Sequence, residues 1–305
     1  HQIASRQYLL EKQLAQTLAA LGYDEILSYS LHGADVFEKL RRGGVTPSGN
    51  AVEVRNPLSE DQRYLRTTLG AGLLQYFSRN PGAHRIFEIG HVFSQDAGHT
   101  TEVPVVTIGF SAQALDEPAW RDSHFLHLKG DIEALIRRVC GVECNAVRDV
   151  RSGLHPGKTA ALLCDGREIA HFGKIDPRLN KTFDIALPVY LCNIYLDALP
   201  DYRTSAYRPP SKYPSTYRDL SLVVDLSVSA ERISNITRES IGSLCMGVRV
   251  FDEYRGKRIG DGHKSLAIRA VIGRYDATIT DAEADAAIAR ALESLRDHVG
   301  ATIRA

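Results

Sequence analysis

The sequence predicts two α/β domains, each built on a mostly antiparallel sheet. The last third has strand and helix patterns in the order βαββαβ, and the first part mixes apolar strand patterns with amphipathic helices. A proline-rich segment separates the two parts. A chain of 305 residues is long enough to form two hydrophobic cores.

The patterns of the last third are regular. Leu220, Leu222 and Val224 recur at every second position, as in a half-buried strand. Ser229 can cap a helix rich in isoleucine, and Thr280, followed by a glutamate three residues later, can open a second helix with a capping box. The expected elements are a strand at 220–225, a helix at 228–241, strands at 248–254 and 264–272, a helix at 281–299 and a strand at 301–304. This order is that of a ferredoxin-like fold.

Two helices can cover only one face of such a sheet, so the other face should be open. Strand alternation places Ser221, Asp252, Tyr254 and Ser265 on that open face if Phe251 points into the core. An exposed tyrosine beside a carboxylate and small hydroxyls suits an unpaired nucleobase, because the ring can stack on the base while the polar groups bind its edge. Stacking of this kind contributes roughly 1–3 kcal/mol per base.

Basic residues surround this predicted site. Residues 255–274 contain six lysines and arginines but a single acidic residue, Asp261, which is enough to attract a phosphate backbone. An exposed tyrosine can also be a cross-strand packing residue, and basic residues at an edge can simply be solvated, so the residues alone leave RNA binding open. The candidates for contact with an RNA backbone are Arg218, Arg255, Lys257, Lys264 and Arg269.

The first part is expected to form one domain. Its predicted elements are helices at 5–21, 72–79 and 128–139 and strands at 24–31, 52–55, 85–93, 103–110, 160–164, 169–173 and 189–195. We therefore expect a core domain at 1–198, a linker at 199–212 and the second domain at 213–305. The chain begins at His1 inside a helical pattern, which suggests a piece excised from a longer protein, with His1 left from a tag.

Composition limits the functional classes. The formal net charge is zero, which argues against indiscriminate binding of nucleic acid. No apolar stretch approaches the roughly 18 residues of a membrane span, and no secretory signal is present, so we expect a cytoplasmic protein without a membrane partner. The five cysteines are scattered without the paired spacing of a zinc site, so we expect reduced thiols and no bound metal.

Two sets of motifs resemble one family. YP-x-x-x-RDLSLVVD from Tyr213, FDEY-x-G from Phe251, GHKSLA from Gly262 and T-x-TDAE from Thr278 are similar to the ferredoxin-like anticodon-binding domain of phenylalanyl-tRNA synthetases. NPLS-x-x-x-x-x-LRTTL from Asn56, with RIFEIGHVF, LKGDIEALI, LHPGKTA and HFGKIDP-x-L, resembles the class II synthetase-like core of the bacterial beta subunit. The resemblance covers nearly the whole chain in one consistent order.

The resemblance implies specific roles. The residues that match Ser221, Asp252, Tyr254 and Ser265 surround the first anticodon base in that family. The family's beta subunit pairs with a catalytic alpha subunit, which activates phenylalanine with ATP and Mg²⁺, in a two-alpha, two-beta assembly that charges phenylalanine tRNA. The chain would thus be a subunit of a ligase without a cofactor of its own.

The core sequence argues against a catalytic site in this chain. A class II site needs an arginine for the adenylate phosphate, yet the matching strand reads Phe87-Glu-Ile-Gly90, and the second, glycine-rich arginine motif is also missing. Arg66 and His155 invite catalytic roles, but we interpret both as bracing residues.

Two alternatives remain open from the sequence. One is a free-standing paralogue that binds RNA or a protein partner without a synthetase role. The other is a diverged adenylate-forming enzyme, which pyrophosphate exchange by this chain alone would reveal.

Overall fold

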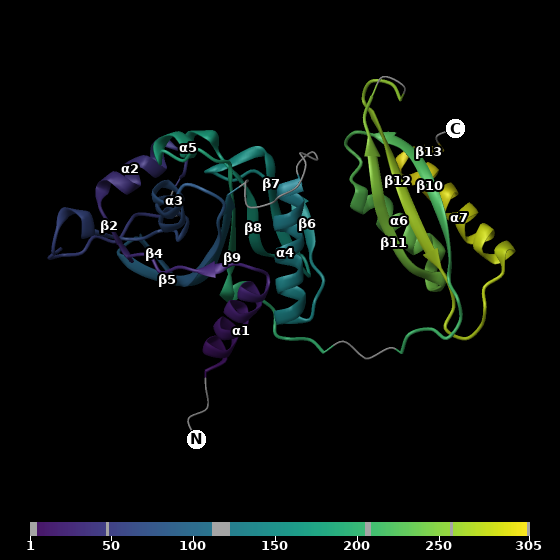
Figure 1. Cartoon of the computed structure of the whole chain (residues 1–305), viewed down its shortest axis with the longest axis horizontal. Helices are drawn as coiled ribbons and strands as arrows, with labels where there is room; N and C mark the ends of the chain where they lie inside the picture. Colours follow the sequence, from purple (N-terminus) through teal and green to yellow (C-terminus); the bar gives the residue numbers. More distant parts are fainter. Residues whose placement is uncertain (1–4, 47–48, 112–122, 205–208, 257–258, 304–305) are drawn as a thin grey trace. The chain divides into compact units, whose positions relative to one another are not determined.

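The chain forms two compact units, His1–Ser205 and Ala206–Ala305 (Figure 1). The computed structural model describes residues 5–46, 49–111, 123–204, 209–256 and 259–303. Each unit contains its own clusters of buried apolar side chains. The predicted fold class, a mixed α/β chain with an antiparallel-sheet core followed by a ferredoxin-like βαββαβ domain, is confirmed.

The described part of the first unit is built on a seven-stranded sheet in the order β1-β4-β5-β9-β8-β7-β6. Neighbouring strands are antiparallel, except that β1 runs parallel to β4. The strands are β1 Asp24–Glu25, β4 Arg85–Asp96, β5 His99–Ser111, β6 Asn145–Arg148, β7 Leu154–Cys164, β8 Arg167–Ile175 and β9 Val189–Tyr195.

Helices pack on both faces of this sheet (Figure 1). One face is covered by α1 (Arg6–Ala20) and α4 (Ser123–Cys140), and the other by α2 (Ala34–Arg42), α3 (Gly70–Arg79) and α5 (Pro177–Thr182). The shorter elements are β2 Leu31–His32, its partner β3 Tyr64–Leu65, and 3-10 helices at Glu60–Gln62 and Leu196–Ala198.

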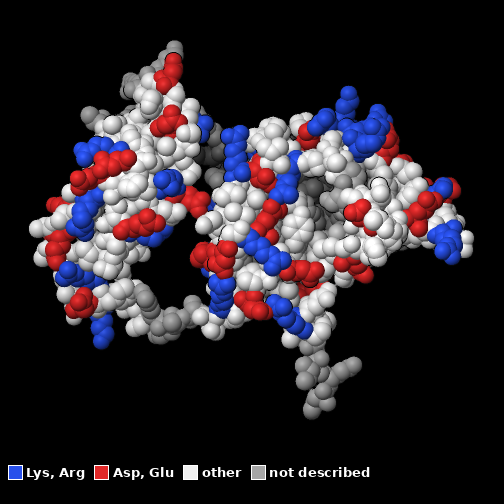
Figure 2. All heavy atoms as spheres, turned by 180° about the vertical axis from the view of Figure 1, so that it is seen from behind, with Lys and Arg blue, Asp and Glu red and all other residues white. Residues whose placement is uncertain are grey.

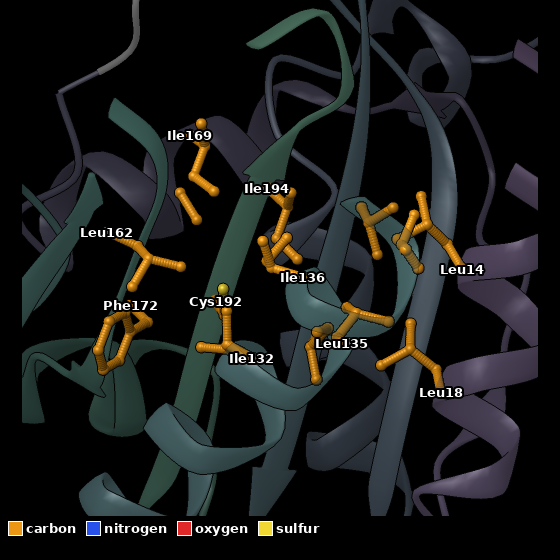
Figure 3. Packing of buried hydrophobic residues seen from close by; sticks show 14 of the residues in the cluster. Leu14, Leu18, Ile132, Leu135, Ile136, Leu162, Ile169, Phe172, Cys192 and Ile194 are labelled. Carbon is orange, nitrogen blue, oxygen red and sulfur yellow. The ribbon is translucent and has the colours of Figure 1, made fainter. Parts of the chain in front are cut away.

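The larger core lies between the sheet and the helices α1 and α4. Leu18 of α1 and Ile132 of α4 are completely buried there against strand residues such as Phe172 and Ile194. Figure 3 shows the side chains of both helices directed toward those of the strands. Burying each large apolar side chain contributes roughly 1.5–3 kcal/mol, so this layer holds α4 firmly on the sheet.

Two strands predicted in the first part are wrong. Only the two ends of the segment 24–31 pair, as β1 and β2, because the chain leaves the sheet between them. There, the backbone N–H and the hydroxyl of Ser28 donate to the Glu88 carboxylate at 3.2 and 2.7 Å instead of to a neighbouring strand. The segment 52–55 contributes a single bridge, from Glu53, rather than a strand. The sequence reasoning also missed α2, α5 and β6.

A buried ion pair braces the chain next to this irregular segment. Arg66 Nη1 lies 2.6 Å from Glu88 Oε1, and the two side chains are 7% and 1% exposed. Arg66 Nε also donates to the carbonyl oxygen of His91 at 2.8 Å. A Cβ at Gly90 would lie 2.4 Å from Arg66 Nη2, so only glycine leaves room for the guanidinium. Arg66 is therefore a structural residue, in agreement with its interpretation from the sequence.

The described part of the second unit has a four-stranded sheet in the order β11-β12-β10-β13, with α6 and α7 on one face. Ser229 caps α6, and Thr280 and Glu283 form the predicted capping box of α7. The elements are β10 Thr216–Asp225, α6 Ala230–Ile241, a 3-10 turn at Gly242–Leu244, β11 Cys245–Tyr254, β12 His263–Ile272, α7 Asp281–Val299 and β13 Thr302–Ile303.

The segment expected to be a linker is partly fixed to the first unit. Leu199 is 6% exposed within the larger core, and the Arg203 N–H donates to the carbonyl oxygen of Cys140 at 2.8 Å. At its other end, the Ser211 hydroxyl donates to the carbonyl oxygen of Arg274 at 2.7 Å. Among the helices that the structure describes, none is long and apolar enough to cross a membrane.

Replacing Glu88 by alanine should lower the unfolding free energy of the first unit by about 3–5 kcal/mol, because Arg66 would stay buried without its counter-charge. Amide hydrogen exchange in β4 would measure this energy for the unit on its own. Glu38→Ala, which breaks an exposed ion pair with Arg41, is the matched control and should change exchange very little. Equal effects of the two substitutions would contradict the bracing role of Glu88.

Candidate nucleic-acid interface

The sheet of the second unit has one helix-covered face and one open face. Leu222 and Val224 of β10 and Leu266 and Ile268 of β12 are almost fully buried beneath the two helices. Because side chains alternate along a strand, the intervening residues point to the opposite face. In β10 and β12 these include Tyr217, Asp219, Ser221, Ser265 and Arg269.

A β-bulge in β11 reverses this alternation. Val250 pairs with Ile268, whereas Asp252 pairs with Ala267, so Phe251 and Asp252 together oppose one residue of β12. The prediction that Phe251 points into the core is wrong: its side chain is half exposed and lies 5.7 Å from the guanidinium of Arg269 on the open face. Asp252 reaches the open face because of the bulge, not because Phe251 is buried.

The four predicted base-contact residues occupy neighbouring positions. Tyr254 pairs directly with Ser265, and Asp252 and Ser221 both pair with Ala267 from its two sides. The hydroxyl oxygens of Ser221 and Ser265 are 3.4 Å apart. A ring, a carboxylate and two hydroxyls therefore meet in one patch across three strands, although Ser265 itself is only 4% exposed.

Tyr254 is 38% exposed, and the turn that follows β11 limits where its ring can lie. A Cβ at Gly256 would be 2.5 Å from the Tyr254 hydroxyl oxygen, so the absence of a side chain at position 256 makes room for the phenol. The hydroxyl end of the ring thus lies close to the turn at Gly256, and part of the residue stays exposed.

Arg269 lies on the open face but is engaged by its neighbours. Its Nε and Nη2 donate to the two carboxylate oxygens of Asp219, both at 2.7 Å, and this contact lowers the pKa of Asp219. The guanidinium carbon is 4.1 Å from the centre of the Tyr217 ring. Sequence reasoning did not single out Tyr217 or Arg249, which pairs with Arg269 in β11, although the two-residue period of the strands places both on this face.

Arg218 and Lys264 belong to the helix-covered side. Arg218 bonds to Asp281 at 3.0 Å and to Asp285 at 2.9 Å, both in the first turns of α7. Lys264 is 6% exposed and shares a strand face with Leu266, away from Tyr254. Their positions fit bracing of α7 and of the sheet end.

Arg255 follows β11 directly and is more exposed. Its side chain is 57% exposed and its Nε donates to Glu253 at 2.6 Å. Lys257, the remaining backbone candidate, lies outside the described residues. In Figure 2, basic and acidic side chains stand close together over most of the face displayed, consistent with the formal net charge of zero.

The two residues of the first unit weighed for catalysis, Arg66 and His155, both make structural contacts. The ring Nδ1 of His155, the other residue weighed for catalysis, accepts a hydrogen bond from the Gly157 N–H at 3.0 Å, a local contact at the start of β7. Within the described ranges, there is no group of three or more His, Cys, Asp or Glu that could hold a metal ion.

Solved structures identify the general class of the fold. Pyrrolysyl-tRNA synthetase from Desulfitobacterium hafniense superposes on this chain with a TM-score of 0.50 and 18% sequence identity, covering 64% of this chain and 67% of that one. A second crystal structure of the same enzyme gives the same TM-score and identity. The chain thus shares the fold of an aminoacyl-tRNA synthetase, and it carries a ferredoxin-like domain beyond it.

The sequence comparisons define the family. The model of the phenylalanyl tRNA synthetase beta chain CLM domain matches residues 2–196, and that of the ferredoxin-fold anticodon binding domain matches residues 211–304. The chain belongs to the phenylalanyl-tRNA synthetase beta chain family.

Curated relatives agree with this assignment. The phenylalanine–tRNA ligase beta subunit of Symbiobacterium thermophilum is 31% identical over 311 residues, covering 98% of this chain and 35% of the relative. That of Hahella chejuensis is 30% identical over 300 residues, covering 96% and 37%. The chain therefore spans little more than a third of the length of these relatives.

Arg218, which is bound to α7, and Arg255, which is exposed just beyond β11, should behave differently when RNA is offered. Arg218→Gln should loosen α7 and lower the midpoint of thermal unfolding slightly, yet leave the salt dependence of RNA binding unchanged. Arg255→Gln should leave stability unchanged and reduce the slope of log K against log salt by about 0.7, the value for one single-stranded phosphate contact. A reduced slope in Arg218→Gln would assign that residue to the RNA backbone instead.

Proposed function

We propose that this chain is the part of a phenylalanine–tRNA ligase beta subunit that supports the catalytic alpha subunit and holds the anticodon stem-loop of phenylalanine tRNA. Residues 1–198 would form a non-catalytic core, 199–212 a linker and 213–305 the anticodon-binding domain. ATP and Mg²⁺ would be used by the alpha subunit, in a cytoplasmic assembly of two alpha and two beta chains.

The observation that carries this proposal is the grouping of Ser221, Asp252, Tyr254 and Ser265 on the open face, inside a domain that matches an anticodon-binding family. A base turned out of the anticodon loop can stack on the exposed surface of the Tyr254 ring. The Asp252 carboxylate can accept hydrogen bonds from N–H groups of the base edge, and the serine hydroxyls can donate or accept.

Backbone contacts would come from Arg269 on the open face and from the exposed Arg255 just beyond the end of β11. Arg255 and Arg269 are the arginines of the predicted set whose positions suit a phosphate near the base site, and each already has a carboxylate partner. Arg218 and Lys264, also predicted, are better placed to keep the sheet and α7 in position.

The first unit offers apolar surface for a protein partner. Leu27, Tyr29 and Leu58 lie in the segments between β1 and β3 and are 86%, 79% and 95% exposed. Exposed apolar side chains mark a protein contact where they form one contiguous patch. We propose that these segments contact the alpha subunit.

The decisive experiment compares binding of this chain to phenylalanine tRNA and to the same tRNA with its anticodon replaced, over a series of salt concentrations. Discrimination that persists as salt rises supports reading of the bases by the second unit without the alpha subunit. Equal affinity for both RNAs, decreasing together with salt, would leave only electrostatic attraction and would contradict anticodon reading by this chain alone.

Tyr254→Leu should weaken binding of the intact anticodon by about 1–3 kcal/mol, because it removes the stacking surface. The fold should persist, as the side chain is partly exposed and outside the core clusters. Tyr275→Leu changes a tyrosine that is 52% exposed and lies after β12, and serves as the matched control. The proposal for Tyr254 fails if both variants bind like the original chain.

The double substitution Leu27→Ser and Tyr29→Ser should weaken association with the alpha subunit by about tenfold or more, as expected for anchors at the centre of an interface. Leu126→Ser, at a residue of α4 that is 60% exposed, should not affect it. Sedimentation of mixtures at several concentrations measures the change. Unaltered assembly in the double variant would move the interface elsewhere.

A further inference from the structure

A cavity of about 330 Å³ lies in the first unit, on the sheet face that carries α2, α3 and α5. Its size falls at the lower end of small-molecule sites. One part of the wall is apolar and includes six leucines: Leu40, Leu69, Leu74, Leu154, Leu179 and Leu191. Polar side chains of β8 and β9 form another part of the wall: His171, Asn193 and Tyr195.

These polar residues form a hydrogen-bonded chain that starts at Thr107 in β5. The Thr107 hydroxyl donates to Asn193 Oδ1 at 2.7 Å, and Asn193 Nδ2 lies 3.1 Å from His171 Nε2. His171 Nδ1 is 3.2 Å from the Tyr195 hydroxyl oxygen. Thr107 is completely buried, so reversing the Asn193 amide would leave the threonine hydroxyl proton without this acceptor.

The hydrogen bonds among Thr107, Asn193, His171 and Tyr195 all run in one direction. An amide N–H₂ can only donate, so Nε2 of His171 must accept. Burial lowers the pKa of His171 to about 4, and the ring is therefore neutral and carries its one proton on Nδ1. Nδ1–H then donates to Tyr195, whose own hydroxyl proton remains for a group in the cavity. Burial also raises the pKa of Tyr195, which keeps the phenol protonated.

The cavity wall favours an uncharged occupant. Among the described residues that line the cavity, the charged side chain is that of Arg151. Its guanidinium is already bound by Asp149 and Glu168. Because two carboxylates face one guanidinium, an anionic ligand would meet a surplus of negative charge there. The leucine wall in turn requires an apolar body.

We propose that this cavity binds a small uncharged molecule with an apolar, ring-sized body and a carbonyl or ring-nitrogen acceptor that takes the hydroxyl proton of Tyr195. The site is separate from the proposed anticodon surface and does not depend on it. Its recognition element is the fixed direction of the chain Thr107, Asn193, His171, Tyr195.

Two isosteric probes test this directly on the 305-residue chain. Acetophenone carries a carbonyl oxygen, and α-methylstyrene has a CH₂ group in its place. Both should shift the amide resonances of residues lining the cavity, in a saturable manner. Tyr195→Phe should weaken acetophenone binding about five- to tenfold, the effect of one lost hydrogen bond, and leave α-methylstyrene binding unchanged.

Tyr202→Phe, at a tyrosine that is 61% exposed and outside the cavity wall, is the control and should alter neither affinity. Unchanged α-methylstyrene binding also shows that the Tyr195→Phe cavity is intact. The proposal is overturned if neither probe saturates, or if Tyr195→Phe changes the affinity for both probes equally.

Discussion

The open face of the second unit depends on one bulge in β11. Val248 and Val250 pack under the helices, and simple alternation would send positions 252 and 254 to the same side. Asp252 would then lie opposite Leu266 on the helix-covered side, and Tyr254 would leave the open face with it. The extra residue opposite Ala267 brings Asp252 and Tyr254 to the solvent face, next to Ser221 and Ser265. The geometry of the candidate base site is therefore a property of the strand pairing rather than of any single side chain.

Arg269 on this face and Arg255 just beyond β11 each already have a carboxylate partner within the same unit. Arg269 is bound to Asp219 through two hydrogen bonds, and Arg255 contacts Glu253. A phosphate that approached either guanidinium would compete with an ion pair already present, which reduces the gain from simple attraction. Such a surface favours ligands that also offer base contacts, since stacking and edge hydrogen bonds do not require an ion pair to break. This agrees with a chain whose formal charge is zero.

Local chemistry explains which features could be predicted from the sequence. The α7 boundaries follow from the Thr280 capping box and a regular apolar stripe, and β9 follows from an apolar run, because both signals lie within the element. The broken segment 24–31 could not be foreseen, since its alternation is that of a strand and the partner that draws Ser28 away, Glu88, is sixty positions later. The faces of Ser221 and Ser265 followed from alternation. The bulge at Phe251 could not be predicted, because it is set by pairing with β12. Lys264 was predicted as an RNA contact from its charge, but its position in the strand buries it.

β11 is also an edge strand of its sheet, so the same strand that carries the candidate site is exposed to pairing with other chains. An unpaired strand edge invites pairing with another chain, and bulges and charged side chains are the usual protection. The described part of β11 has register shifts between Cys245 and Gly247 and between Val250 and Asp252, with Arg249 and Glu253 along the strand. The second of these shifts is the one that exposes Asp252 and Tyr254. One irregularity therefore both interrupts the edge and creates the candidate binding surface, so a regular β11 would lose the surface and gain an edge prone to association.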